Sequence, residues 1–441
     1  MIHIDFSKTV GPIKRMHCVN NGPMKRKTDQ INDNYDTYKA LKIPFARNHD
    51  ASFSSEYGGS HTVDVCNIFP DFNADVNDPA SYDFVLTDEY VARTHEVGTK
   101  TFYRLGSKIE HEIKKYGTLP PPDFQKWAEI CEHIIRHMNE GWADGHHFGI
   151  EYWEIWNEAD GAKDDDDYYW HKCWGGTEAQ FHDFYEIAAK HLKKCFPDLK
   201  IGGPAATCPS DWLERFLSEM KKRNVPIDFV SYHCYTNYPD GIRIEAEKGQ
   251  AIMDRCGYGD AENILNEWNY VRGWTDDYVY SIEAMHGVKG AAFTMATISL
   301  CQPAPVDMLM YYDARPSTQF NGMWDFYTSR PIPGYYPFVM FGKLYEMGSE
   351  TFLSGAPESV YATAATDGRG KNAVMLSCYT DEDDDKKVRR LTLSVQGTNA
   401  TAAVVTFVDE KHPVPAQKEL PVQNGRIHVT MKPGSFMLIE L

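Results

Sequence analysis

Two glutamates, Glu158 and Glu267, each end a short apolar segment, and each directly follows an asparagine. The two segments, residues 151–158 and 263–269, are rich in Trp, Ile, Leu and Tyr, which is typical of strands buried in a parallel sheet. A carboxylate at the carboxyl end of such a strand does not help stability, but barrel enzymes assemble their active sites from those strand ends. Two carboxylates that face each other are what cleavage of a glycosidic bond requires. The sequence therefore predicts a catalytic pair, Glu158 and Glu267.

A structural role for these acids is the alternative, since a lone glutamate at a strand end can also pair with Arg or Lys. The repeated Asn-Glu context favours catalysis for both. Glu154 is the contrasting case, because it lies in the middle of its segment. Period-two alternation places it on the same face as Trp156 and Glu158 but deeper in the sheet. We expect Glu154 to be a structural acid of a barrel interior.

Short apolar segments alternate with amphipathic helices between residues 16 and 350. This alternation is typical of an α/β fold with a parallel sheet and helical crossovers. The expected strands are residues 16–19, 44–47, 100–105, 151–158, 200–203, 228–235, 263–268 and 307–312. Eight such repeats predict a (β/α)8 TIM barrel. No glycine-rich phosphate loop follows these segments in the sequence, which argues against a nucleotide-binding sheet.

Two of the expected helices have clear boundaries. One begins after Asp123, which follows three prolines and can cap the helix, and its apolar residues from Phe124 to Met138 recur every three or four positions. The other runs from Glu178 to about Cys195 and ends before Pro197.

Beyond residue 350 the pattern changes to strand-like runs separated by Gly, Pro and charged turns, at residues 361–365, 373–379, 391–395, 402–407, 427–431 and 436–441. This pattern predicts a small antiparallel β-sandwich over residues 351–441. Residues 3–6 precede the barrel, and we expect the N-terminal segment 1–15 to join the sandwich. Two charge runs, residues 163–167 and 381–387, are expected to be solvated loops. The first follows Glu158 closely enough to border a cleft.

Composition narrows the classes of partner. The net charge of −18 argues against a nucleic-acid or anionic membrane partner, and no apolar run approaches the ~18 residues of a membrane span. The ten cysteines show no CxxC pair or disulfide-framework spacing, and residues 1–6 do not read as a secretory signal. We therefore expect a cytoplasmic protein, and the sequence leaves open whether it forms homo-oligomers.

Further polar residues follow other expected strands: Arg47 and His49 after the second, and His233 and Tyr235 at the end of the sixth. Both histidines fall on the side of the barrel where Glu158 and Glu267 are expected. A metal-dependent hydrolase would use such histidines together with the acids. That alternative is less favoured, because the chain has no HxH or HExxH motif.

The chain resembles clan A of the retaining glycoside hydrolases in three of its strand ends, Trp156-Asn157-Glu158, His233-Cys234-Tyr235 and Glu267-Trp268. More narrowly, it resembles glycoside hydrolase family 39, the family of β-xylosidases and α-L-iduronidases. Supporting segments are residues 18–23, 47–49, 201–205 and 228–231. The resemblance extends over nearly the whole chain.

The resemblance implies that Glu158 is the acid/base and Glu267 the nucleophile. It implies that Asn157 bonds the sugar 2-hydroxyl and that Tyr235 orients the nucleophile. The residues that it implies around the non-reducing sugar are Arg47, His49 and His233. Trp324, after the eighth strand, is either a sugar platform or a core residue.

The activity implied is that of a retaining exo-glycosidase acting on short oligosaccharides or glycosides, most simply a β-xylosidase, without cofactor or metal. A related enzyme for arabinose or uronic acid, an α-L-arabinofuranosidase or an iduronidase, is the nearest alternative. The chain departs from the family pattern at Ala159, where proline is usual, and at Asn269, where a small residue is commoner; both departures bear on sugar specificity. A catalytically silent glycan-binding protein is a third possibility, but it would usually lack one of the two carboxylates, and both are present.

Overall fold

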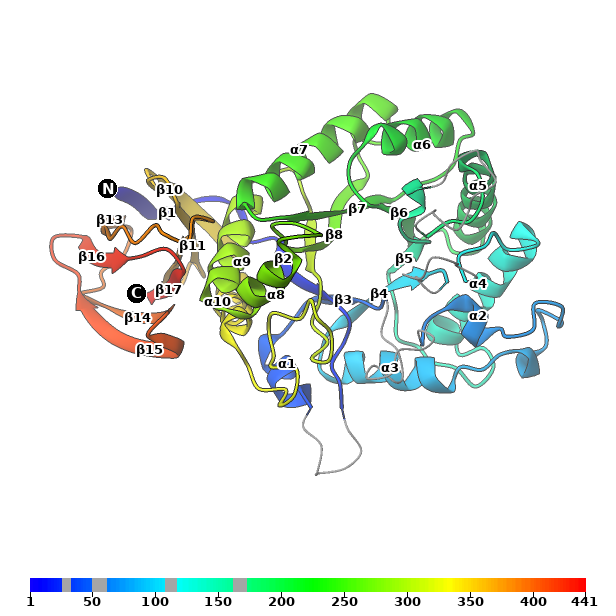
Figure 1. Ribbon diagram of the computed structural model, residues 1–441, viewed down its shortest axis with the longest axis horizontal. Coiled ribbons are helices and arrows are strands. Elements are labelled where there is room, and N and C mark those ends of the chain that lie inside the picture. Colours follow the sequence, from blue (N-terminus) through cyan, green and yellow to red (C-terminus); the bar gives the residue numbers. More distant parts are fainter. Residues whose placement is uncertain (26–32, 50–61, 108–116, 162–172) are drawn as a thin grey trace.

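The computed structural model describes residues 1–25, 33–49, 62–107, 117–161 and 173–441. Eight parallel strands close into a barrel, and a second sheet of nine strands lies to one side of it (Figure 1). The barrel strands are β2 (Arg15–Asn20), β3 (Phe45–Arg47), β4 (Lys100–Leu105), β5 (Tyr152–Ile155), β6 (Lys200–Ala206), β7 (Phe229–Thr236), β8 (Glu262–Tyr270) and β9 (Met308–Tyr311). Each lies within or overlaps one of the eight segments predicted from the sequence. The predicted (β/α)8 barrel with an appended β domain is thus confirmed.

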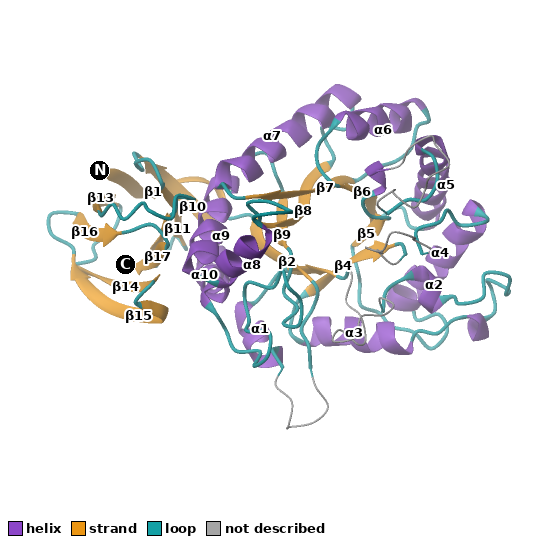
Figure 2. Ribbon diagram, in the orientation of Figure 1, coloured by secondary structure: helices purple, strands orange, loops and turns teal. Residues whose placement is uncertain are grey.

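Helices surround the barrel (Figure 2). They are α1 (Tyr35–Leu41), α2 (Val65–Ile68), α3 (Val85–Glu96), α4 (Phe124–Glu140), α5 (Glu178–Cys195), α6 (Asp211–Lys222), α7 (Pro239–Cys256), α8 (Tyr278–His286), α9 (Val288–Cys301) and α10 (Tyr336–Met347). The cap predicted for α4 is present, because the Asp123 carboxylate accepts the Lys126 N–H at 3.0 Å. No helix in these stretches is long and apolar enough to cross a bilayer.

The interior of the barrel is layered, and the layers determine where the site lies. The layer nearer the amino ends of the strands is a buried cluster of mainly apolar side chains, namely Cys18, Phe45, Phe102, Tyr152, Phe229, Ile264, Met308 and Met310. Two residues further along six of these strands, the buried side chains are polar: Asn20, Arg47, Arg104, Glu154, Ser231 and Asn266. Period-two alternation thus sets a polar layer directly above an apolar one.

Glu154 belongs to this polar layer and is fully buried, as expected for a barrel-interior acid. Its carboxylate accepts hydrogen bonds from Arg47 at 2.6 Å and Ser231 at 2.6 Å. The prediction that Trp156 shares its face was wrong. Strand β5 ends at Ile155, and Trp156 has a φ of 72°, so its ring packs outward against Phe184 of α5.

The second sheet has the order β15-β14-β17-β12-β11-β10-β1-β13-β16. Its strands are β1 (Ile2–Pro12), β10 (Ser349–Ser354), β11 (Val360–Thr366), β12 (Asn372–Cys378), β13 (Arg389–Gln396), β14 (Ala402–Asp409), β15 (His412–Pro421), β16 (Arg426–Met431) and β17 (Ser435–Glu440). The strand pairs of this sheet are antiparallel except for β1 and β13, which pair in parallel. The N-terminal strand is therefore an internal strand of this sheet rather than an edge.

The two charge runs have different outcomes. The run 163–167 lies outside the described residues. The run 381–387 is not simply a solvated loop, because Asp381 is partly buried against the barrel. Its carboxylate accepts hydrogen bonds from Tyr270 at 2.7 Å and Arg272 at 2.9 Å. A charged segment of the β domain is therefore docked where β8 leaves the barrel.

Candidate active site

Glu158 lies just beyond β5, in a segment with unusual backbone geometry. Trp156 and Glu158 both have left-handed φ angles, 72° and 48°, and the Glu158 N–H donates to the Ala205 carbonyl at 2.8 Å. This turn carries the Glu158 side chain to the end of the barrel, where it is 22% exposed. Its carboxylate accepts a hydrogen bond from His233 Nδ1 at 2.9 Å.

Glu267 lies on β8 and is the more enclosed acid, with a side chain that is 7% exposed. Arg47 Nη1 donates to its Oε1 at 2.7 Å, and the Tyr235 hydroxyl donates to its Oε2 at 2.8 Å. His49 Nε2 lies 3.3 Å from Oε1. These donors fix both oxygens and stabilise the carboxylate in its ionised form.

The two acids approach each other closely. His233 Nδ1 lies between them, 2.9 Å from Glu158 Oε1 and 3.4 Å from Glu267 Oε2. This nitrogen and one oxygen of each carboxylate all lie within 4.8 Å of one another. Retaining glycosidases hold their carboxyl groups about 5–5.5 Å apart, whereas inverting ones need ~6.5–9.5 Å to admit a water. The separation here matches the retaining geometry.

Arg47 holds these groups in place from below. Its Nε bonds Glu154 at 2.6 Å, and its Nη2 donates to Asn157 Oδ1 at 2.7 Å. Burial lowers the pKa of Arg47, but the charges of Glu154 and Glu267 outweigh this effect and raise its pKa overall. The side chain of Arg47 is fully buried, and its bonds to Glu154, Glu267 and Asn157 position these groups. A role of Arg47 in the sugar subsite stays a prediction from the resemblance.

Asn157 has its amide orientation determined by Arg47. The carbonyl oxygen accepts from the guanidinium, so the Nδ2 group points the other way. This buried Nδ2 has no hydrogen-bond partner among the described residues. An unsatisfied buried donor beside the two acids is the group needed to bond a ligand hydroxyl.

His233 is fully buried between the acids. Burial lowers its pKa, but the Glu267 charge and the hydrogen bond to Glu158 outweigh it, so the pKa is raised overall. Nδ1 is therefore the donor toward the carboxylates. Tyr235 is partly exposed at the end of β7. The loss of water around its hydroxyl, together with the nearby Glu267 charge, raises its pKa well above the ordinary value. Its hydroxyl therefore stays protonated and donates to Glu267.

Trp324 is not a sugar platform, because it is buried in the main core. Its ring stacks on Tyr38 with centroids 6.0 Å apart, and its Nε1 donates to Thr37 Oγ1 at 2.9 Å. The exposed aromatic residue near the site is Trp274, which the sequence analysis missed. Its side chain is 58% exposed, and its ring centroid lies 5.3 Å from that of Tyr235.

Trp274 belongs to an aromatic wall that also contains Tyr235, Tyr278, Tyr312 and Phe320, whose rings lie 5.3–6.4 Å apart in contacting pairs. The wall begins at Tyr235 beside Glu267 and extends to solvent at Trp274. Its members come from segments at or after β7, β8 and β9, so no local pattern in the sequence brings them together.

A metal ion is also conceivable between Glu158, His233 and Glu267 on distance alone. The Arg47 guanidinium, however, already binds Glu267 at 2.7 Å and would repel a cation there. The arrangement instead suits two carboxylates that share a site, one of them fixed by donors and the other partly open to solvent.

Comparisons with known proteins show what this chain is similar to. The chain is 32% identical over 129 residues to a β-xylosidase of Geobacillus stearothermophilus. The aligned stretch covers 28% of this chain and 23% of that protein. It is 30% identical over 166 residues to a β-xylosidase of Caldicellulosiruptor saccharolyticus, covering 35% of this chain and 31% of that protein. These alignments thus span less than a third of either relative.

A solved structure shares the whole architecture. A glucosidase from Croceicoccus marinus superposes with a TM-score of 0.79 at 22% identity, covering 100% of this chain and 98% of that one. At this identity the likeness shows a common fold. The profile of "Glycosyl hydrolases family 39" matches residues 1–261, which is more than half of the 441 residues. The chain therefore belongs to glycosyl hydrolase family 39.

Proposed function

We propose that this protein is a retaining exo-glycosidase that removes xylose from short β-xylosides. The observation that carries the proposal is the pair of carboxylates, Glu158 and Glu267, with oxygens within 4.8 Å of each other at one end of the barrel. At this separation a water has no room beside the bound sugar, so a double displacement is favoured over direct attack.

The surroundings of the two acids assign their roles. Arg47 and Tyr235 keep Glu267 ionised and fixed, as a nucleophile requires. Glu267 attacks the anomeric carbon, while Glu158 gives its proton to the leaving oxygen as the glycosidic bond breaks. In the second step Glu158 takes a proton from water, the water attacks the same carbon, and the bond to Glu267 breaks. The partial exposure of Glu158 gives it access to that water.

Xylose is proposed because the aligned curated relatives are β-xylosidases. The runner-up substrates are arabinofuranosides and α-L-iduronides. A cytoplasmic location, as expected from the sequence, is part of the proposal. It is supported by Cys18, Cys131, Cys234 and Cys301, which are buried and form no disulfide.

The test of the mechanism is the anomeric configuration of the first sugar that the enzyme releases. We expect NMR to show β-xylose as the initial product of an aryl β-xyloside, before mutarotation. A 2-fluoro xyloside with a good leaving group should add its sugar mass to the peptide that contains Glu267. Initial α-xylose, or a label on another peptide, would contradict the mechanism.

The preferred sugar is tested separately, by comparing aryl glycosides of β-xylose, β-glucose, α-L-arabinofuranose and α-L-iduronic acid. The highest kcat/KM is expected with β-xylose. Loss of activity in a chelator would favour the metal-dependent alternative, and binding of xylo-oligosaccharides without turnover would favour a silent binding protein.

A further inference from the structure

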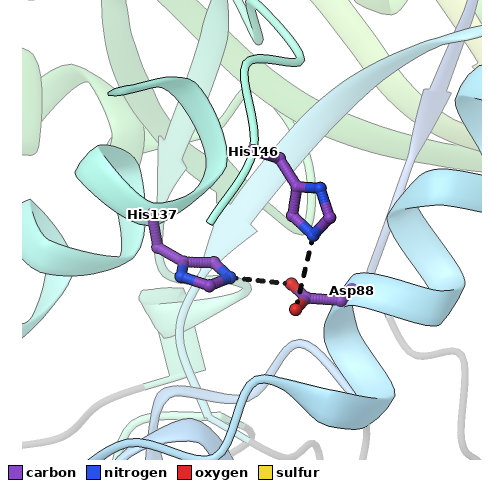
Figure 3. A group of neighbouring side chains, drawn as sticks. All are labelled: Asp88, His137 and His146. Atoms are coloured by element: carbon purple, nitrogen blue, oxygen red, sulfur yellow. Dashed lines mark hydrogen bonds and ion pairs between the residues drawn. The ribbon is translucent and has the colours of Figure 1, made fainter. Parts of the chain in front are cut away.

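We propose that Asp88, His137 and His146 form a binding site for a divalent transition-metal ion such as Zn²⁺, on the outside of the barrel. Asp88 is on α3, His137 is near the end of α4, and His146 is in the segment that follows α4. Figure 3 shows both imidazole rings directing Nε2 toward the Asp88 carboxylate, at 2.9 Å for His137 and 3.4 Å for His146. One ligand atom from each residue lies within 4.8 Å of the other two.

The contacts of the His137 ring indicate that a positively charged species lies between its Nε2 and the Asp88 carboxylate. Its Nδ1 lies 2.8 Å from the Trp142 carbonyl, and a carbonyl only accepts, so Nδ1 carries the hydrogen. In the neutral ring Nε2 then directs a lone pair at the Asp88 carboxylate, which places two acceptors 2.9 Å apart. Either a proton or a metal ion must lie between them. A ring N–H that donates to a backbone carbonyl is the usual arrangement for a metal-binding histidine.

His146 favours the metal over a single proton, because a second Nε2 converges on the same carboxylate through its other oxygen. Two imidazoles and one carboxylate form a common ligand set for Zn²⁺ with a further position open to water. The side chains of His146 and Asp88 are 34% and 27% exposed, so an ion has a path from solvent.

The backbone after α4 is folded in a way that directs His146 to this place. The His146 N–H donates to the His137 carbonyl at 2.6 Å, and the Phe148 N–H donates to the Met138 carbonyl at 2.9 Å. Gly145 allows this close approach, since a Cβ there would lie 2.2 Å from the His137 carbonyl oxygen. The two histidines are thus held together by the main chain.

The charges around Asp88 distinguish this cluster from two others of similar composition. Arg47 binds Glu267 in the catalytic cluster, and Arg136 binds Glu132 beside His191 and Cys195. Asp88, by contrast, makes its ion pairs only with His137 and His146 among residues whose positions are described. A metal ion at Asp88 would therefore displace no arginine or lysine of the described segments.

The role expected for the metal is structural. It would tie α3 to the end of α4 and to the segment that precedes β5, and it shares no residue with the Glu158 and Glu267 pair. The proposal does not depend on the sugar or on the mechanism.

The test titrates Zn²⁺ and Co²⁺ into the full chain after removal of metals with EDTA. We expect saturable binding of one Zn²⁺ per chain by calorimetry, a higher Tm with Zn²⁺, and a visible Co²⁺ absorption band. Loss of one ligand in His146→Ala should weaken binding by at least about tenfold and abolish the Co²⁺ band. Hydrolysis by the metal-free wild type should match that of the metal-loaded protein.

His147→Ala is the matched control, because the neighbouring His147 is exposed and bonds the Asn139 carbonyl rather than Asp88. It should bind like the wild type. Asp88→Asn provides a second variant if His146→Ala does not fold, which its metal-free Tm would reveal. Absence of saturable binding by the wild type, or equal binding by wild type and His146→Ala, would overturn the proposal. Zn²⁺ that inhibits hydrolysis and still binds His146→Ala would lie at the catalytic cluster and would also overturn it.

Discussion

At the scale of single residues, Arg47 connects the barrel interior to the candidate active site. Its guanidinium bonds Glu154 in the polar layer below and Glu267 and Asn157 above. One buried cation thus compensates two buried carboxylates and orients an amide. The position of Glu267 therefore depends on Arg47 and Glu154, both of which are fully buried.

The roles of the two acids predict that, in the presence of azide, variants of the two residues give glycosyl azides of opposite anomeric configuration. Glu267→Ala should lower turnover of an aryl β-xyloside by about 10⁴-fold or more, since no covalent intermediate can form. Azide fits the space on the nucleophile side, so it should restore turnover and give an α-xylosyl azide. In Glu158→Ala the intermediate still forms from a substrate with a good leaving group, and azide should then give the β-xylosyl azide. NMR of the two products distinguishes them, and the same anomer from both variants would contradict the assignment.

His233 predicts a pH dependence of stability. The acids raise its pKa in the folded protein despite burial, so its imidazolium form contributes stability that is fully present below the unfolded value of ~6.5. That contribution is lost as the pH rises through the folded-state pKa. The Tm of wild type minus that of His233→Gln should therefore be largest below pH ~6.5 and fall as the pH rises above that value through the raised folded-state pKa. Differential scanning fluorimetry measures it, with the exposed His147→Gln as control; a difference that grows with pH would contradict the charge state.

Much of the site could be predicted from strand ends alone. Glu158, Glu267, Asn157, His233 and Tyr235 each lie at the carboxyl end of a segment whose strand character is plain in the sequence, and the closed barrel brings those ends together. The direction of a side chain beyond a strand could not be predicted. Trp324 turns into the core, and Trp274 meets Tyr235 only through a contact between the ends of separate strands.

At the scale of elements, strands were predictable where burial makes them apolar and less so where they are exposed. Strand β15 was missed because it is largely exposed and contains Pro413, Pro415 and Pro421, which are tolerated only at an edge. The outward turn of Trp156 was missed for a different reason, since a left-handed φ in a non-glycine residue leaves no trace in an apolar pattern.

The loop that carries Asp381 is predicted to support the catalytic strands. Its carboxylate binds Asn237, just after β7, at 2.7 Å and Arg272, just after β8, at 2.9 Å. Asp381→Asn should cost about 1–3 kcal/mol of stability, because charged hydrogen bonds are lost in a partly buried place. It should also lower kcat/KM, since Tyr235 and Glu267 lie on the same two strands. The exposed Asp384→Asn is the matched control and should resemble the wild type.

The pH dependence of that variant follows from the pKa of Asp381. Burial raises this pKa, but the hydrogen bonds from Tyr270 and Arg272 outweigh burial and lower it overall. The carboxylate therefore contributes stability above the unfolded value of about 3.9, and the contribution is lost as the pH falls through the folded-state pKa. The Tm difference between wild type and Asp381→Asn should shrink toward acid pH. A constant difference from acid to neutral pH would mean that the carboxylate charge is not what holds the loop.

At the scale of the whole molecule, the β domain and the barrel share a core. Along β12 the side chains alternate between two hydrophobic clusters: Val374 and Leu376 pack inside the β domain, and Ala373 and Met375 pack with the barrel helices. Ser377 Oγ also donates to the Ala292 carbonyl of α9 at 2.7 Å. Figure 1 shows α9 and α10 between the barrel and the second sheet, with both chain termini in that sheet. A strand buried on both faces couples the two parts.

This coupling predicts that the protein unfolds in one cooperative transition, which a substitution far from the barrel can shift as a whole. Ile4 on β1 is 1% exposed and packs in the core of the β domain, whereas Val10 on the same strand is 56% exposed. Ile4→Ala should cost about 2–5 kcal/mol, as for other large-to-small changes in a core. Val10→Ala should stay within about 0.5 kcal/mol of the wild type, as most surface changes do.

Scanning calorimetry should show a single peak that moves to lower temperature in Ile4→Ala, with kcat unchanged at temperatures where the protein is folded. Two peaks, of which Ile4→Ala moves only one, would mean that β1 and its sheet unfold independently and that the shared face of β12 does not couple them to the barrel.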